Sequence, residues 1–332
     1  MNSKLGLGPM SSEIIEAVFR YSDKNNKQLM LIASKNQIDY NGGYVNKWTT
    51  SQYIDYTNQL KNKYPSSDVK ICRDHCGPGF NKNYDLADTY KTIKSDIESG
   101  FDLIHVDFCH YKGSKQELLT ESKKAIGYCL NLNPKIELEI GTDENTGAVF
   151  GLEQLVQLEK DIDFFKGFCN PLFYVVQTGS LIKEINQVGK FNDCFVKEIA
   201  QVLHSKKLRL KEHNADYLTT NEIEKRKDIV DAMNIAPQLG VIQTQLILQK
   251  CLVYGIDFSD FSNIVYSSKK WEKWLQNNTK ENKHLCTLIA GHYHFASEEY
   301  SRIIEKLNGH EDANEMIINT IMEVINHYEN NQ

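Results

Sequence analysis

The sequence predicts an α/β protein of the (β/α)8 TIM-barrel class with an appended C-terminal helical segment. Short apolar runs alternate with longer amphipathic runs, which is typical of strands and helices in a parallel sheet. The alternation occurs eight times, and a closed barrel needs eight such units. The chain has 332 residues. This length fits a barrel of ~250 residues with ~80 more, whereas two domains of ~150 residues are the alternative.

The predicted strands are short, apolar and flanked by polar residues, and the predicted helices lie between them. The strands are residues 5–8, 29–33, 69–73, 103–107, 136–141, 173–177, 208–211 and 232–235. The helices are residues 11–21, 49–64, 84–99, 115–130, 152–165, 192–205, 220–230 and 238–254. After residue 254 only helices are predicted, most clearly 297–307 and 313–328. We therefore divide the chain into a barrel, 1–255, and a helical extension, 256–332, packed on it.

Composition narrows the classes of function. The chain is 41% hydrophobic and 25% charged, as globular proteins are. Its net charge of −6 disfavours nucleic acid as a partner, because phosphate backbones need clustered Lys and Arg. No run approaches the ~18 apolar residues of a membrane span, and residues 1–9 do not resemble a signal peptide. We expect a cytoplasmic protein whose eight cysteines are free thiols, since none form a CxxC pair.

Polar residues gather where the predicted strands end, which is where barrel enzymes place their catalytic groups. In strand order they include Ser34, Lys35, Asn36, Gln37 and Gly43, then Asp74 and His75, His105 and Asp107, Glu139, Gln177, His213 and Asn234. The sequence therefore predicts a functional site on this rim.

The residue types on the rim favour a metal centre. His75 and His213, with a carboxylate such as Glu139, have the ligand atoms of a Zn²⁺ site, and Mn²⁺ or Co²⁺ also suit them. A metal so held can polarise a substrate carbonyl. Asp74 can act beside it as a general acid or base on a substrate hydroxyl. A His-Asp pair is more often an ordinary hydrogen bond, but two histidines and three acids on one rim disfavour that interpretation.

Several motifs resemble one family in order and spacing. They are residues 31–37 with 42–44, Asp74-His75-Cys76-Gly77-Pro78, Ile104-His105-Val106-Asp107, residues 140–142, residues 175–177 and residues 212–217. Together with the helical tail they resemble the tagatose-bisphosphate aldolase subunit family of the GatZ/KbaZ type, which is related to class II ketose-bisphosphate aldolases. The resemblance spans nearly the whole chain. It implies a TIM barrel and chemistry on a small sugar or sugar phosphate.

The resemblance also implies roles for single residues. Asp74 would move a proton at the C4 oxygen, His75 and His213 would bind the metal, and Glu139 would approach it from the fifth strand. Glu144 falls near the acid that abstracts a proton in the aldolases. Asn234 resembles an asparagine that contacts substrate. We expect further substrate contacts from the rim residues Ser34, Asn36, Gln37, Gly43 and Asp107.

Two departures from the aldolase pattern leave alternatives open. The aldolases have a third histidine after the sixth strand, where this chain has Gln177, so either Gln177 or Glu139 completes the metal site. Their phosphate loop is replaced here by residues 214–216, and Asp216 would repel a phosphate. We expect aldol cleavage or C4 epimerisation of a ketose or ketose phosphate by a homo-oligomer. The alternatives are a non-catalytic stabilising subunit of an aldolase, or a barrel isomerase acting at C1 and C2.

Overall fold

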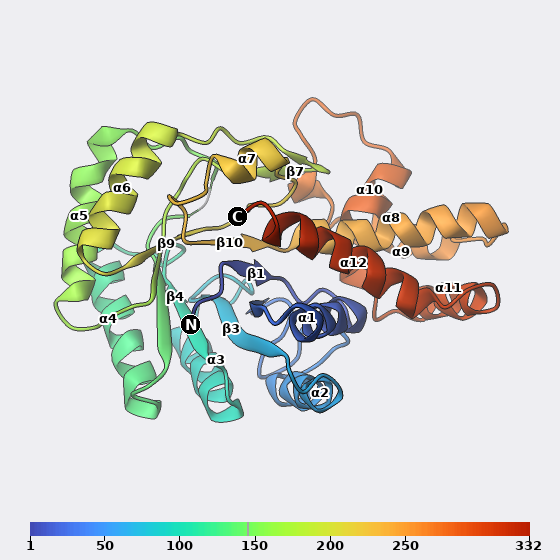
Figure 1. Cartoon of the computed structure of the whole chain (residues 1–332), viewed down its shortest axis with the longest axis horizontal. Helices are drawn as coiled ribbons and strands as arrows, with labels where there is room; N and C mark the ends of the chain where they lie inside the picture. The colour runs from blue at the N-terminus through green and yellow to red at the C-terminus, as the bar shows by residue number, and fades with distance from the viewer. Residues whose placement is uncertain (145) are drawn as a thin grey trace.

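A computed structural model describes residues 1–144 and 146–332, and in these residues eight parallel strands close into a barrel (Figure 1). The strands follow the order β1-β10-β9-β6-β5-β4-β3-β2, and β1 closes the sheet by pairing with both β2 and β10. They are β1 Leu5–Leu7, β2 Gln28–Ser34, β3 Asp68–Cys76, β4 Leu103–Asp107, β5 Glu137–Gly141, β6 Phe173–Val175, β9 Arg209–Glu212 and β10 Ala232–Ile235. The predicted TIM-barrel class is confirmed, and each predicted strand overlaps one of these eight.

Helices follow the strands around the outside of the barrel. They are α1 Ser12–Asn25, α2 Thr50–Lys63, α3 Leu86–Ser99, α4 Lys115–Leu132, α5 Leu152–Lys166, α6 Asp193–Ser205, α7 Thr220–Glu224 and α8 Pro237–Tyr254. Side-chain caps fix several starts: Ser11 accepts a hydrogen bond from the Ile14 N–H, and Thr49 forms a capping box with Gln52. These caps explain why the predicted helix starts agree with the structure to within about two residues.

Two elements differ from the prediction. The helix expected over 220–230 ends after five residues as α7, because the chain continues in tight turns and reaches a left-handed backbone at Asp228, with φ of 63°. After β6 the chain forms an unpredicted hairpin of β7 Ile182–Lys183 and β8 Asn186–Gln187. Strands of two residues have no periodicity that a sequence pattern can reveal.

The barrel interior is apolar at one end and contains charged side chains toward the other. Six side chains from the strands form a small apolar cluster of their own: Met30, Ile32, Cys72, Leu103, Phe173 and Ala232. The Lys211 ammonium lies 5.0 Å from the centre of the Phe173 ring and 2.6 Å from Glu139, and both charged side chains are buried. The interior is therefore apolar at the strand starts and ionisable toward the strand ends, where the predicted site lies.

The chain after α8 is helical, with α9 Ser259–Ser267, α10 Lys283–Ala290, α11 Glu298–Asn308 and α12 Ala313–Glu329. Helix α12 runs beside α1 and α8 (Figure 1). Its buried residues, such as Ile321, belong to the same hydrophobic core as the barrel helices. The proposed division at residue 255 therefore separates elements that pack against one another.

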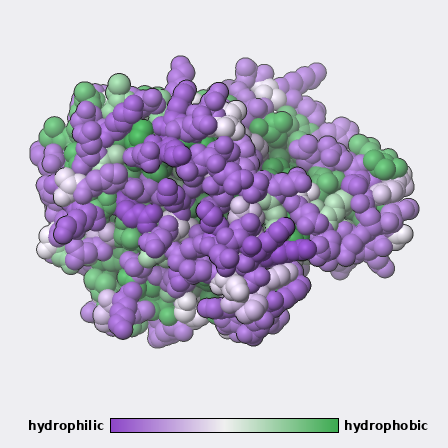
Figure 2. Space-filling model, in the orientation of Figure 1, coloured by the Kyte–Doolittle hydropathy of each residue, from purple (hydrophilic) through white to green (hydrophobic). Residues whose placement is uncertain are grey.

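Several contacts join the extension to the rim of the barrel. The Tyr328 hydroxyl of α12 donates a hydrogen bond to the Ala215 carbonyl in the loop after β9. The Trp274 carbonyl accepts one from the Glu184 N–H in the β7–β8 turn. Figure 2 shows a mainly hydrophilic face with small hydrophobic areas, one of them on the projecting arm that α8 and the extension form. Among the described helices, none is long and apolar enough to cross a bilayer.

A buried ion pair ties β3 to its surroundings. The Arg73 guanidinium donates to both oxygens of Asp96 on α3, at 2.6 and 2.7 Å, and to the carbonyls of Ala33 and Ile38. We expect Arg73→Met to lower the free energy of unfolding by about 3–5 kcal/mol, because it leaves the Asp96 charge buried and unpaired. Urea unfolding followed by circular dichroism measures this change.

The control is Arg20→Met, which breaks an ion pair with Glu315 whose side chains are 33% and 48% exposed. An exposed pair contributes only about 0–1 kcal/mol. Equal losses in the two variants would contradict the role given to Arg73.

Candidate metal centre at the barrel mouth

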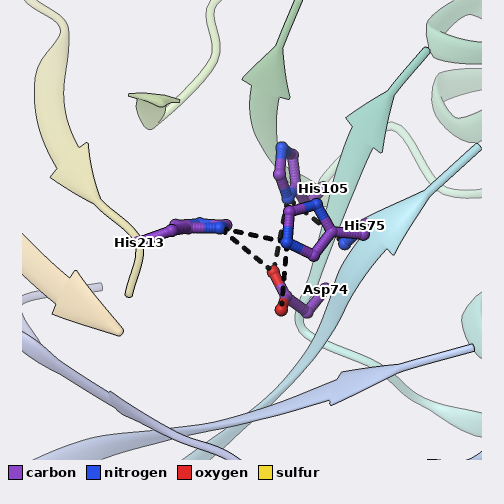
Figure 3. Close-up of side chains that lie close together, drawn as sticks. All are labelled: Asp74, His75, His105 and His213. Carbon is purple, nitrogen blue, oxygen red and sulfur yellow. Dashed lines mark hydrogen bonds and ion pairs between the residues drawn. The ribbon is translucent and has the colours of Figure 1, made fainter. Parts of the chain in front are cut away.

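Four side chains at the strand ends converge on one point (Figure 3). Asp74 and His75 come from the end of β3, His105 from β4, and His213 from the residue after β9. Each offers one ligand atom, and these atoms all lie within 4.8 Å of one another. Three imidazoles and a carboxylate are the donor set that Zn²⁺ and similar divalent ions prefer.

A distortion of β3 brings two consecutive residues to the same centre. Side chains along a regular strand alternate between its two faces. The pairing of β3 with β4 shifts register between Arg73 and Cys76, and His75 has a left-handed backbone with φ of 49°. A bulge of this kind redirects side chains, and a non-glycine residue in this conformation costs about 1–3 kcal/mol. Strain at His75 is what allows it to face the centre together with Asp74.

A buried carboxylate fixes each of two imidazoles. The His75 Nδ1 lies 2.7 Å from Asp107 Oδ2, and the His213 Nε2 lies 2.8 Å from Glu139 Oε1. Since an ionised carboxylate only accepts hydrogen bonds, these ring nitrogens carry the protons. The remaining nitrogens, His75 Nε2 and His213 Nδ1, then face each other at 3.3 Å.

Two ring nitrogens that both point lone pairs at each other require a cation between them. A proton on His75 is one solution: burial lowers its pKa, but the Asp74 and Asp107 carboxylates outweigh burial and raise the pKa to about 9. Burial lowers the pKa of His213 below its usual range. A metal ion is the other solution, because ligand nitrogens ~2.0–2.1 Å from a tetrahedral Zn²⁺ lie about 3.3 Å apart. The residues therefore fit a bound metal.

His105 is the third imidazole of the cluster, and the sequence did not mark it as a ligand. Its Nδ1 accepts a hydrogen bond from the His75 backbone N–H at 3.2 Å and lies 3.4 Å from Asp74 Oδ1. Its Nε2 is buried and has no hydrogen-bond partner among the described residues. The aldolase pattern has its third histidine after the sixth strand, whereas His105 lies on the fourth. The signal that could have found His105 is its spacing of two from Asp107, which places both on the interior face of β4.

The carboxylates near the cluster are held in their ionised form. Burial alone would raise the pKa of Asp74, but His75 and His213 lower it far below its ordinary value. In the same way Lys211, His105 and His213 outweigh burial and lower the pKa of Glu139 to about 2.

Both oxygens of Glu139 already have partners among the side chains around them. Its Oε1 contacts His213, and its Oε2 lies 2.6 Å from the Lys211 ammonium. Glu139 is thus placed to orient His213, as carboxylates that bind the second nitrogen of a ligand histidine do.

Gln177 and Glu144 lie on the loops that follow β6 and β5. The Gln177 amide donates to the Glu144 carbonyl and accepts from the Thr146 N–H, so it joins the two loops. The Glu144 side chain is 60% exposed, and its Oε2 lies 3.9 Å from His110 Nδ1. The Gln177 side chain therefore hydrogen-bonds to the loop after β5, and the Glu144 carboxylate is exposed to solvent.

The predicted substrate residues at the end of β2 hydrogen-bond within their own loop and to the loop after β3. The Gln37 Oε1 accepts from the Ser34 N–H, and the Asn36 amide donates to the Phe80 carbonyl. A Cβ on Gly43 would lie 2.0 Å from the Gln37 carbonyl oxygen, so only glycine fits there. These residues shape the rim beside Asp74.

Asn234, at the end of β10, differs from the residues after β2 because its side chain has no hydrogen-bond partner in the part of the chain that the structure describes. Its side-chain amide is buried, and neither Oδ1 nor Nδ2 has a hydrogen-bond partner within the described residues. Buried polar groups are nearly always satisfied, so an unpartnered amide at a strand end is suited to contact a ligand.

Comparison with known proteins supports the resemblance found in the motifs. A family model described as D-tagatose-1,6-bisphosphate aldolase subunit GatZ/KbaZ-like matches residues 9–126, so the resemblance is confirmed over this part of the chain. That part carries β2, β3 and β4, and with them Asp74, His75 and His105.

Solved structures share the fold at low identity. One is a probable tagatose 6 phosphate kinase from Sinorhizobium meliloti 1021, with a TM-score of 0.79 and 13% identity over 99% of this chain and 100% of that one. A second is fructose-bisphosphate aldolase from Campylobacter jejuni, with a TM-score of 0.64 and 12% identity over 98% and 90%. A third is the YdjI aldolase from Escherichia coli K12, with a TM-score of 0.53 and 11% identity over 94% and 92%.

The geometry leads to an expected order of metal affinities. We expect His75→Ala, His105→Ala and His213→Ala each to weaken Zn²⁺ binding more than Asp107→Asn does. Asp107→Asn should weaken it by about 10–100-fold, because it removes only the group that orients His75. Competition with a chromophoric chelator measures each affinity.

His284→Ala is the matched control, because His284 is an exposed histidine on α10 and its loss should leave affinity unchanged. A His105→Ala variant that binds Zn²⁺ as tightly as the unaltered protein would remove His105 from the site. Gln177→Ala should then be tested as the ligand variant.

Proposed function

We propose that this protein is a divalent-metal-dependent enzyme of the class II aldolase type. It would act at C3–C4 of a ketose or ketose phosphate by aldol cleavage or C4 epimerisation. The observation that carries the proposal is the convergence of Asp74, His75, His105 and His213 at the mouth of the barrel. The family-model match over residues 9–126 and the shared fold of two aldolases support it.

The proposed metal ligands are the three imidazoles, with the Asp74 carboxylate beside them. Asp107 and Glu139 orient His75 and His213 through their second ring nitrogens. Zn²⁺ suits this donor set best, although Mn²⁺ or Co²⁺ would also bind it. When bound, the ion would supply Lewis-acid polarisation of the substrate carbonyl.

The chain's own groups account for the proton steps. Asp74, ionised at neutral pH, would accept the proton of the C4 hydroxyl, whereupon the C3–C4 bond breaks and C4 becomes an aldehyde carbon. For cleavage, C3 would take up a proton from water, which the exposed Glu144 would relay, and Asp74 would release the C4 hydroxyl proton to solvent. For epimerisation, C3 would add again to the opposite face of the aldehyde, and Asp74 would return its proton. The unpartnered Asn234 amide would hold a substrate oxygen.

The second candidate function is a non-catalytic subunit that stabilises an aldolase. The description of the matching family, which names an aldolase subunit, favours it. An accessory subunit would have no need of the strained backbone at His75 or of an acid beside the imidazoles. We therefore favour the enzyme.

Turnover in D₂O tests the proposed reaction. Protein reloaded with Zn²⁺ is incubated with a panel of ketoses and ketose phosphates and followed by ¹H-NMR. We expect cleavage products or a C4 epimer, and we expect Asp74→Asn to slow their formation about 10²–10⁴-fold, because it removes the base at the C4 hydroxyl.

Asp55→Asn, on the exposed face of α2, is the control and should leave the rate unchanged. If Zn²⁺-loaded protein converts no ketose on the panel, the enzyme proposal fails and the subunit remains. If Asp74→Asn loses nothing while C1 exchanges with solvent, the chemistry is enolisation instead.

A further inference from the structure

The loops after β9 and β10 meet at the start of α8. Asp216, three residues beyond His213, lies in the first of these loops. The Ala215 N–H donates to the Asn234 carbonyl at 3.0 Å and joins the two loops. The Asp216 side chain then turns toward the helix, where its Oδ1 accepts hydrogen bonds from the Ala236 and Gln238 N–H groups at 2.9 and 2.8 Å. A carboxylate of the chain itself therefore caps α8.

The start of a helix near these two loops is where barrel proteins commonly bind a substrate phosphate, through backbone N–H groups that converge on it. In this chain the donors of that turn are already used. Asp216 takes the N–H groups of Ala236 and Gln238, Pro237 has none, and the Leu239 N–H bonds to the Ala236 carbonyl.

The loop that carries Asp216 is held in place from both sides. Asp216 is fully buried, and Gln187 of the β7–β8 hairpin donates to its carbonyl and to that of Asn214. From the other side the Tyr328 hydroxyl of α12 donates to the Ala215 carbonyl. The carboxylate is therefore built into the fold and does not swing into the position from solvent.

The guanidinium that contacts the end of β9 has a partner as well. Arg226, in the turn after α7, donates to both oxygens of Glu212, at 2.6 and 3.0 Å. Its side chain is buried with that partner. A phosphate at α8 would thus find neither free backbone donors nor this cation.

We propose that Asp216 determines specificity by holding the place of a substrate phosphate at the start of α8. The site then takes a ketose whose end beside α8 carries a hydroxyl and no phosphate. This inference rests on the proposed function for the identity of the substrate, but the occupation of the phosphate position by Asp216 is tested without turnover.

The test titrates inorganic phosphate into metal-free protein and follows the amide signals of Ala236 and Gln238 by NMR. In the unaltered protein we expect no shift of either amide. In Asp216→Ser we expect both to shift and the affinity for phosphate to rise about tenfold or more, since the freed donors gain an ionised acceptor. Serine is shorter than aspartate, so it leaves the Ala236 and Gln238 N–H groups without the carboxylate that accepts from them in the unaltered protein.

Asp216→Asn is the matched control. Its amide oxygen still fills the position without the charge, so phosphate affinity should stay as in the unaltered protein. Circular dichroism reports whether each variant folds. Shifts of Ala236 and Gln238 in the unaltered protein, or a folded Asp216→Ser with no gain in affinity, would overturn the proposal.

The unaltered protein decides the question if Asp216→Ser does not fold. If the Ala236 and Gln238 amide signals do not shift at phosphate concentrations that saturate phosphate-binding TIM barrels, the result supports the proposal. If they shift, the proposal is rejected. In turnover, the free ketose should be preferred about tenfold or more over its terminal phosphate. Absence of all turnover would count against the proposed function and would leave the phosphate titration unaffected.

Discussion

The site depends on one contact, the 3.3 Å approach of His75 Nε2 to His213 Nδ1. Each ring already directs its other nitrogen to a buried carboxylate, Asp107 in one case and Glu139 in the other. Neither imidazole can rotate away without removing a hydrogen bond from that buried carboxylate, and an acceptor left unsatisfied in the interior costs about 1–3 kcal/mol. The two lone pairs are therefore fixed face to face, and a cation between them relieves the repulsion.

Charge balance favours the same conclusion. Three buried or nearly buried carboxylates, Asp74, Asp107 and Glu139, surround the imidazoles, and Lys211 is the ammonium that pairs with one of them. Three negative charges against one positive leave two negative charges when the imidazoles are neutral. Buried charges need compensation, and a divalent cation supplies the missing two. Protonation of His75 would supply only one.

The sequence predicted the barrel because apolar and amphipathic runs alternate eight times, so an error in one element does not change the predicted fold. It predicted Asp74, His75 and His213 as site residues because they stand where predicted strands end. It placed His105 on the rim without a ligand role, since a histidine inside a strand looks like a core residue until the sheet closes. It could not predict that Asp216 caps α8, because the loop and the helix start are 20 residues apart and meet only through the pairing of β9 with β10. The periodicity of apolar residues indicates where helices and strands lie. Which side chains contact each other across strands is decided only when the barrel closes.

The central claim is that the imidazoles of His75, His105 and His213 share one metal ion. X-ray absorption of the Zn²⁺-loaded protein tests it most directly, because imidazole rings give a distinctive multiple-scattering pattern. We expect about three histidine nitrogens at ~2.0–2.1 Å with one or two oxygens. A first shell of oxygens or thiolates without imidazole scattering, or no bound zinc at all, would contradict the account.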